Sequence, residues 1–302
     1  MALLMTLLKP QFLTSNNIIM NIIRQQTAEA IMAVGITFTI ISGGIDISGG
    51  SVIALCSVVV ALFAHPVGDA AGPGQFPLIV TILAGIVVGG ILGTISGLVI
   101  SYGSLLPFIA TLGMASAARG LALIVSGGRP VNGFTKAFDF IGGGSVLGIP
   151  ILIFILAFVF VIGYILLHKT KFGTYVYAIG GNEVAAIVSG VKVKRNKTLV
   201  YTLAGSFNGI AAVALASRIL AGVPSVGVGY ELSAIAMAVI GGVSFSGGIG
   251  NIFGTIVGAF IVGILTNGMT MLQIDSSLQM VVKGAVIVSA VLLDERKYRY
   301  KK

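Results

Sequence analysis

Nine long apolar segments constrain this chain more than any other feature of its sequence. A membrane-spanning helix needs about 20 mostly apolar residues. Charged residues make up only 9% of the chain, whereas soluble domains carry about 25%. Nine acids and eighteen bases cannot coat a globule of 302 residues, which excludes a soluble enzyme, a disordered chain and a coiled coil. The sequence therefore predicts an all-α, polytopic membrane protein with a single domain over residues 1–302.

The predicted spans end where glycine, proline or charged residues interrupt the apolar segments. A further helix is expected before them, because residues 1–8 are apolar but lack the basic leader and cleavage site of a signal peptide. We interpret them as the end of a first helix whose start is missing, which gives about ten transmembrane helices. The nine complete spans are placed near residues 18–42, 51–65, 77–101, 105–126, 150–167, 199–220, 232–248, 251–272 and 278–293.

Positive charge predicts the orientation, because loops rich in lysine and arginine stay on the cytoplasmic side. Eleven of the eighteen bases lie in two segments, 168–198 and 294–302. Four predicted spans separate these segments, so both are expected in the cytoplasm, with the loops near 66–76, 128–149 and 221–230 outside. The net charge of +9 then reflects topology and gives no reason to expect a nucleic-acid partner.

The loop 168–198 is the longest predicted cytoplasmic connection. Asn182 and Glu183 can begin a short helix within it, and Gly190 can end it. A short amphipathic helix on a loop is typical of an element that docks into a groove of a soluble partner. A surface helix that lies on lipid headgroups is the alternative.

One eight-residue pattern occurs twice, as GGIDISGG at 43–50 and as GGVSFSGG at 241–248. Each copy follows an apolar segment, and both are expected near the cytoplasmic side. Such a repeated pattern indicates an internal repeat of the fold. Chance similarity is the alternative, because 43 of the 302 residues are glycine.

Asp46 lies within the first of these copies, between two long apolar runs. An acid at membrane depth costs about 2.5–3.5 kcal/mol on insertion scales. It belongs either to a broken helix that lines a solute path or to a cap or ion pair at the start of the next helix. A neutral solute needs only scattered polar groups along its path, and the candidates are Asp46, Ser48, Asn208 and Asn267.

Gly85, Gly89, Gly93 and Gly97 recur every four residues in one predicted helix. One face of that helix is therefore smooth, and a neighbouring helix can approach it closely. This pattern predicts helix packing and carries no chemistry of its own.

Catalytic and nucleotide-binding motifs are absent from the sequence. It contains no paired carboxylates, no HExxH or GxSxG, and no G-x-x-x-x-G-K-[ST] phosphate-binding loop. His65 and His168 lack partners at metal-ligand spacing. We therefore expect no enzyme activity, no metal, no bound cofactor and no ATP on this chain.

Five segments, in order along the chain, resemble the permease subunits of bacterial ABC sugar importers of the ribose type. The resemblance covers residues 9–297, although Gly49, Val184 and Ile187 depart from the family pattern. The segments are GGIDISGGS (43–51), PFIATLG (107–113), GGRPVN (127–132), TKFGTYVYAIGGNEVAAIVSGV (170–191) and GYELSAIAMAVIGGVSFSGGIGNIFGTIVGA (229–259).

The resemblance implies a ten-helix permease of the bacterial inner membrane with a cytoplasmic C-terminus. Its implied partners are an ABC ATPase subunit that binds ATP, an extracytoplasmic sugar-binding protein, and a second permease copy or a paralogue. The implied solute is a monosaccharide, ribose before other sugars. Coupling to the ATPase would fall to the short helix and its flanks, at Gly181, Asn182, Glu183, Ala185, Ala186, Ser189 and Gly190.

A stand-alone secondary transporter coupled to H⁺ or Na⁺ is the alternative function. Asp46 would then be the ion-carrying acid. Its transport would collapse with the ion gradient and persist without an ATPase, so the two hypotheses differ in their source of energy.

Overall fold

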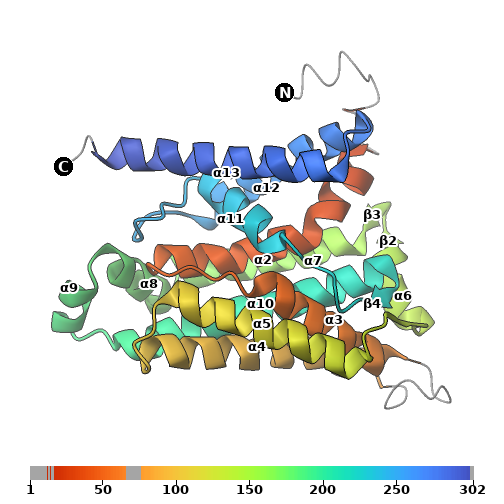
Figure 1. The fold of residues 1–302 in the computed structure, drawn as a ribbon, viewed down its shortest axis with the longest axis horizontal. Coiled ribbons are helices and arrows are strands. Elements are labelled where there is room, and N and C mark those ends of the chain that lie inside the picture. Colours follow the sequence, from red (N-terminus) through yellow and green to blue (C-terminus); the bar gives the residue numbers. More distant parts are fainter. Residues whose placement is uncertain (1–11, 13, 15–16, 66–75, 300–302) are drawn as a thin grey trace.

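The computed structural model describes Phe12, Thr14, residues 17–65 and residues 76–299. The apolar segment 1–8 and nearly all of the predicted loop 66–76 lie outside this part of the chain. Helices form every long element of the described residues, and the strands are two residues long (Figure 1).

The helices follow the apolar segments of the sequence. A π-helical stretch, η2 (Asn17–Ile23), runs directly into α2 (Arg24–Ile41). The other helices, in chain order, are α3 (Gly49–Ala64), α4 (Leu78–Ser101), α5 (Pro107–Ser126), α6 (Lys136–Gly143), α7 (Ile151–His168), α8 (Lys171–Gly181), α9 (Glu183–Val188), α10 (Val193–Ile219), α11 (Tyr230–Ile240), α12 (Ile252–Met271) and α13 (Ser276–Arg299).

The short strands and α6 lie together at one end of the molecule, here called the hairpin end (Figure 1). β1 (Val131–Asn132) pairs antiparallel with β4 (Ala221–Gly222), and β2 (Ser145–Val146) pairs with β3 (Ile149–Pro150). The predicted loops near 128–149 and 221–230 therefore lie on the same side. The opposite end, here called the α9 end, carries α8, α9 and the C-terminal end of α13 (Figure 1).

An inner group of helices forms the core. Every residue of α2 from Gln26 to Ile41 is buried, and α3, α10 and α11 are buried along most of their length. These helices are rich in small residues, which let neighbouring backbones approach closely. One continuous apolar cluster joins all four helices.

The outer helices expose apolar side chains to the surroundings. α5 buries only Thr111, Ala118 and Ala122. Among the described residues, five helices are long and apolar enough to cross a membrane: α4, α5, α7, α10 and α12. Lipid stabilises such surfaces, whereas soluble proteins rarely expose apolar patches larger than a few hundred Å². This arrangement agrees with the prediction of a polytopic helical membrane protein.

Three elements differ in extent from the sequence prediction. The predicted span 232–248 is shorter as a helix, because α11 ends at Ile240 and Gly242 takes a positive φ angle that a helix does not contain. α10 begins at Val193, so the span predicted from residue 199 gains a basic first turn. α8 is a helix where the sequence analysis expected only a loop.

The glycine row of α4 faces α10. Gly89 lies so close to α10 that a Cβ there would clash with the carbonyl oxygen of Gly205. The hydroxyl groups of Thr94 and Thr202 hydrogen-bond across the same interface at 2.8 Å. The two backbones are in van der Waals contact, as the four-residue spacing predicts. In order, Gly85, Gly89, Gly93 and Gly97 lie against Gly209, Gly205, Tyr201 and Thr198.

Candidate functional site

Two irregular segments enter the middle of the helical bundle. Residues 42–48 separate α2 from α3, and residues 223–229 separate β4 from α11. The segments meet where Gly50, at the start of α3, lies against the carbonyl oxygen of Gly227. Non-helical backbone at membrane depth is stable only where it is enclosed by protein or lines a polar path. Broken helices of this kind form the solute sites of many transporters.

Asp46 is buried on the first irregular segment, with 5% of its surface exposed. Its Oδ1 atom accepts hydrogen bonds from the backbone nitrogen of Ser48 at 2.8 Å and from the Ser48 hydroxyl at 2.6 Å. Ser48 directly precedes α3. The carboxylate therefore holds the turn directly before α3, whose N-cap residue makes no side-chain cap.

Two polar side chains of α10 face the same segment. The hydroxyl group of Tyr201 lies against Gly44, and the side-chain amide of Asn208 lies against Gly49. The Tyr201 hydroxyl and Asn208 Oδ1 are buried without a protein hydrogen-bond partner. Such an atom costs about 1–3 kcal/mol, so these atoms mark a place where a polar molecule would gain hydrogen bonds.

Arg119 and Glu231 hold the second irregular segment. Nη1 of Arg119, on α5, donates to the carbonyl oxygens of Pro224 and Val226, each at 2.7 Å. Oε1 of Glu231, on α11, accepts from the backbone nitrogen of Gly229 at 3.3 Å. A guanidinium group and a carboxylate from different helices thus replace the backbone hydrogen bonds that this segment lacks.

Asn267, the fourth candidate for the solute path, lies elsewhere. Its Oδ1 atom accepts a hydrogen bond from Nδ2 of Asn17 at 3.0 Å. Asn17 begins η2, which precedes α2, whereas Asp46 follows α2. A helix of this length spans about 27 Å, so Asn267 is remote from the group formed by Asp46, Ser48 and Asn208.

The two copies of the glycine-rich pattern end their helices in the same way. The amides of residues 42, 43 and 44 donate to the carbonyls of 38, 40 and 39, and those of 241, 242 and 243 donate to 237, 239 and 238. Gly43 and Gly242 have φ angles of +80° and +90°, as glycines that end helices commonly do. In the structure Gly43 therefore corresponds to Gly242, whereas the sequence alignment of the two copies pairs Gly43 with Gly241.

Gly180 of α8 lies between the first of these turns and the loop that follows the second, at Gly247 and Gly248. A Cβ at Gly180 would clash with the carbonyl oxygen of Ile41 and would lie 2.6 Å from the amide nitrogen of Gly248. Close contact here requires glycine, because any side chain would push the two segments apart. α8 therefore connects the irregular ends of α2 and α11 to α9.

A second contact joins α8 to the loop after α11. The hydroxyl of Tyr177 donates to the carbonyl oxygen of Gly250 at 2.7 Å. Burial raises the pKa of Tyr177 above its ordinary value of 10.0, so the hydroxyl stays protonated and remains a donor at physiological pH. This bond adds a directional link to the packing at Gly180.

α9 has well-defined ends that match the helix predicted between Asn182 and Gly190. Oδ1 of Asn182 accepts a hydrogen bond from the amide nitrogen of Ala185 at 2.9 Å, which caps the N-terminus. Gly190, with a φ angle of +83°, follows the C-terminus. Glu183 forms an ion pair with Lys197 of α10 at 2.7 Å, so α9 is tied to the next long helix.

The outward face of α9 is apolar. Ala186 is buried at 3% exposure, whereas Val184, Ile187 and Val188 expose 71%, 56% and 83% of their surfaces. Gly181 and Ser189 are exposed beside them. Three large apolar side chains on a six-residue helix form a surface that favours docking. The sequence analysis named Val184 and Ile187 only as departures from the family pattern, because only the phase of the helix shows which side chains are exposed.

A buried polar cluster also escaped the sequence analysis. The hydroxyl of Ser233, on α11, hydrogen-bonds the Glu29 carboxylate of α2. Nζ of Lys283, on α13, lies 3.4 Å from the Ser233 hydroxyl. The three side chains come from helices far apart in the sequence, so no spacing rule could have brought them together.

Comparison with protein families identifies the type of membrane protein. A family model described as "Branched-chain amino acid transport system / permease component" matches residues 18–291. The chain belongs to this permease family. Both irregular segments and α9 lie within the matched region of the permease. It is thus a membrane-embedded permease component.

Several proteins are similar to this permease along nearly its whole length. The ribose import permease protein RbsC of Bacillus subtilis (strain 168) is 44% identical over 98% of this chain and 90% of its own length. RbsC of Escherichia coli (strain K12) is 41% identical over 96% and 89%. The D-allose transport system permease protein AlsC of Escherichia coli (strain K12) is 37% identical over 95% and 86%. No solved structure matches the permease.

Proposed function

We propose that this permease is the membrane subunit of an ATP-driven importer for a monosaccharide, with ribose as the first choice. The observation that carries the proposal is the 44% identity to the ribose permease of Bacillus subtilis over 98% of the chain. The family description names branched-chain amino acids, but the relatives above are named for ribose and allose. Sugars are therefore the better-supported class of solute.

The solute path is proposed to pass the first turn of α3. Asp46, Ser48, Tyr201 and Asn208 offer carboxylate, hydroxyl and amide groups there, and two of these have atoms without protein partners. Sugar hydroxyls both donate and accept hydrogen bonds, so they match such a mixed set. Asn267 is not part of this proposal, because it pairs with Asn17 at the far end of α2.

We propose one docking partner for each of the two ends of the molecule. An ABC ATPase subunit that binds and hydrolyses ATP would dock on the apolar face of α9, which places the α9 end and the C-terminus in the cytoplasm. An extracytoplasmic sugar-binding protein would dock at the hairpin end. A second permease copy or a paralogue would complete the pore in the bacterial inner membrane. The ten-helix plan and the internal repeat belong to the same proposal.

The contact at Gly180 supports a route from ATP to the pore. Movement of α9 would pass along α8 to the turns after α2 and α11, because Gly180 lies against both. The turn after α2 leads into residues 42–48 and from there to Gly50, which lies against Gly227, whereas the turn after α11 leads to α12. The ATPase and the sugar-binding protein would drive transport by binding the two states of the pore with different affinities.

A pull-down from the native cells in mild detergent, followed by mass spectrometry, tests this function first. Recovery of an ATPase subunit in near-stoichiometric amount, with ribose uptake that stops on ATP depletion, is the expected result. Recovery of the permease alone, with uptake abolished by an ionophore but insensitive to ATP depletion, would establish the secondary transporter instead.

A further inference from the structure

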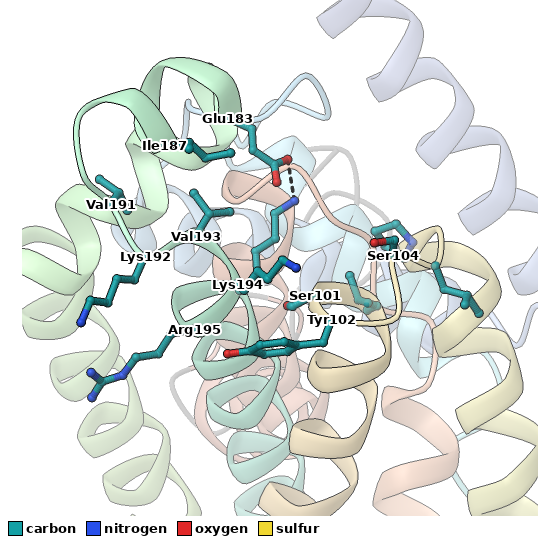
Figure 2. Close-up of a pocket in the computed structure, with 14 residues that line it drawn as sticks. Ser101, Tyr102, Ser104, Glu183, Ile187, Val191, Lys192, Val193, Lys194 and Arg195 are labelled. Carbon is teal, nitrogen blue, oxygen red and sulfur yellow. Dashed lines mark hydrogen bonds and ion pairs between the residues drawn. The ribbon is translucent and has the colours of Figure 1, made fainter.

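A cavity of about 750 Å³ lies at the α9 end of the molecule. It is bounded by the turn between α4 and α5, by α9 and by the first turn of α10 (Figure 2). Part of its lining is apolar, with Ile100, Leu105 and Val193, and part is strongly basic. The solute path proposed above does not pass this cavity, although Glu183 and Ile187 of α9 belong to its lining.

The basic part of the lining comes from the start of α10. Its four members are Lys192, Lys194, Arg195 and Lys197. Glu183 is the one acid in the lining, and it pairs with Lys197 at 2.7 Å. Lys194 points toward Ser101 and Tyr102, whereas Lys192 and Arg195 point away from them, toward a second pocket beside α8 (Figure 2). Nζ of Lys194 lies 5.5 Å from the centroid of the Tyr102 ring, a contact that holds this charge beside the cavity.

The N-terminus of α10 strengthens the positive field. A helix N-terminus carries roughly half a positive charge. The first turn of α10 contains no acid, and Lys192 at the N-cap position makes no side-chain cap. The amides of this turn and the ammonium group of Lys194 therefore favour an anion in the same place.

Ser101 provides an independent sign of a missing ligand. It lines the cavity at the last residue of α4 and is only 7% exposed. Its hydroxyl is buried without a hydrogen-bond partner. Figure 2 shows Ser101 beside Lys194 and Tyr102. A ligand oxygen bound among the bases would satisfy this hydroxyl.

We propose that the cavity binds the phosphate of an anionic lipid headgroup from the adjacent leaflet. Phosphate oxygens suit lysine, arginine and helix amides together. A lipid is favoured over free phosphate because the cavity lies where α4 ends, and apolar side chains continue outward from it along α4 and α5. Leu98, Leu105 and Phe108 are 45%, 43% and 54% exposed, which gives the acyl chains a surface to follow. Basic pockets at the ends of membrane helices bind anionic lipids in this way.

The absence of tryptophan from the chain allows a direct test. The full-length Tyr102→Trp variant places one fluorophore in the cavity and keeps an aromatic ring under Lys194. Its quenching is measured in bilayers that contain brominated phosphatidylglycerol or brominated phosphatidylcholine at equal fractions. We expect stronger quenching by phosphatidylglycerol. Replacing Lys194 and Arg195 by glutamine should weaken that lipid's apparent affinity by about fivefold, because Lys194 is the base that points into the cavity.

Matched controls separate the cavity from general surface charge. Lys169→Gln with Lys171→Gln removes two bases that do not line the cavity and should leave the lipid preference unchanged. Tyr164→Trp, near the end of α7, should be quenched equally by both lipids. Native mass spectrometry of the chain with Tyr102 intact provides a second measurement, in which bound phosphatidylglycerol should be retained and then lost in the Lys194/Arg195 variant.

Three results would overturn the proposal. Equal quenching by both lipids, unchanged in the Lys194/Arg195 variant, would show that the cavity is not a lipid site. A response to inorganic phosphate in purely phosphatidylcholine bilayers, with no lipid preference, would assign the cavity to free phosphate. A change in fluorescence only on addition of the ATPase subunit would assign it to the protein partner.

Discussion

The amide nitrogen of Gly248 donates a hydrogen bond to the carbonyl oxygen of Ile41 at 2.8 Å. This bond joins the turn after α11 to the end of α2, although the two residues are about two hundred positions apart in the sequence. Gly180 lies against both partners. The three segments therefore move together or separate together, and the bond is a natural point at which α9 can act on the pore.

Gly180→Ala tests this junction. The added methyl group would clash with the carbonyl oxygen of Ile41, and overpacking of this kind costs about 1–3 kcal/mol. We expect a lower melting temperature in detergent and a loss of sugar uptake. Gly120→Ala, on α5, is the matched control, because a Cβ there has no neighbour within 4 Å. Equal uptake by the two variants would show that the junction is not part of transport.

Val188→Asp tests the docking face of α9. Val188 is 83% exposed, so an aspartate there should leave the permease folded while it introduces a charge into an apolar contact. We expect at least a tenfold loss of the ATPase in a pull-down, about 1.4 kcal/mol. Leu147→Asp, at a 97% exposed residue of the hairpin end, should keep the ATPase. Retention of the ATPase by both variants would argue against α9 as the docking element.

Asp46→Asn separates the two transport hypotheses. Asparagine keeps an oxygen that can accept the two hydrogen bonds from Ser48 but cannot carry a proton. If Asp46 only holds the start of α3, uptake should remain near normal in Asp46→Asn and fall severalfold in Asp46→Ala, where the acceptor is lost. Uptake measured in vesicles with and without an ionophore checks this. Complete loss in both variants, together with sensitivity to the ionophore, would favour the ion-coupled mechanism.

Gly89→Ala tests the contact between α4 and α10. A Cβ at Gly89 would clash with the backbone of Gly205, so the two helices would have to separate. We expect destabilisation of about 1–3 kcal/mol, seen as a lower melting temperature. Gly113→Ala on α5 has open space around the new methyl group and should be neutral or slightly stabilising, since alanine favours helix. Equal melting temperatures would contradict the close packing.

Lys283→Met tests the buried cluster on α2, α11 and α13. Nζ of Lys283 donates to the Ser233 hydroxyl at 3.4 Å, and loss of a hydrogen bond to a charged group costs about 1.5–3 kcal/mol. We expect strong destabilisation, measured by thermal unfolding in detergent. The double variant Glu29→Gln with Lys283→Met removes both charges and should recover most of the loss. Absence of recovery would mean that Lys283 acts apart from Glu29.

The long apolar segments were predictable because lipid imposes a minimum length of apolar helix. The same rule misplaced the end of α11, since residues 241–248 are uncharged but contain glycines with positive φ angles. Hydropathy reports what can be buried, whereas the helix end depends on backbone conformation. The cap at Asn182 was predictable for the opposite reason, because capping is a local interaction between neighbouring residues.

Long-range contacts limit how much of the candidate site can be predicted from the sequence. The sequence analysis grouped Asn267 with Asp46, Ser48 and Asn208 because all four are polar residues in or near apolar spans. In the structure Asn267 lies elsewhere, beside Asn17. The partners of Glu29 come from α11 and α13. Polarity identifies such residues in the sequence, but their pairing depends on how the helices pack.

The interface between α4 and α10 has a consequence for biosynthesis. The end of α4 at Ser101 and the start of α10 at Val193 are separated by α5 to α9, and a ribosome adds only about 5–20 residues per second. For several seconds, the glycine row of α4 therefore has no native neighbour in the membrane. A face shaped for one particular helix must meanwhile be covered by lipid, by an insertion factor or by a wrong helix. Speed of translation across this stretch thus becomes a determinant of how much permease reaches its native state.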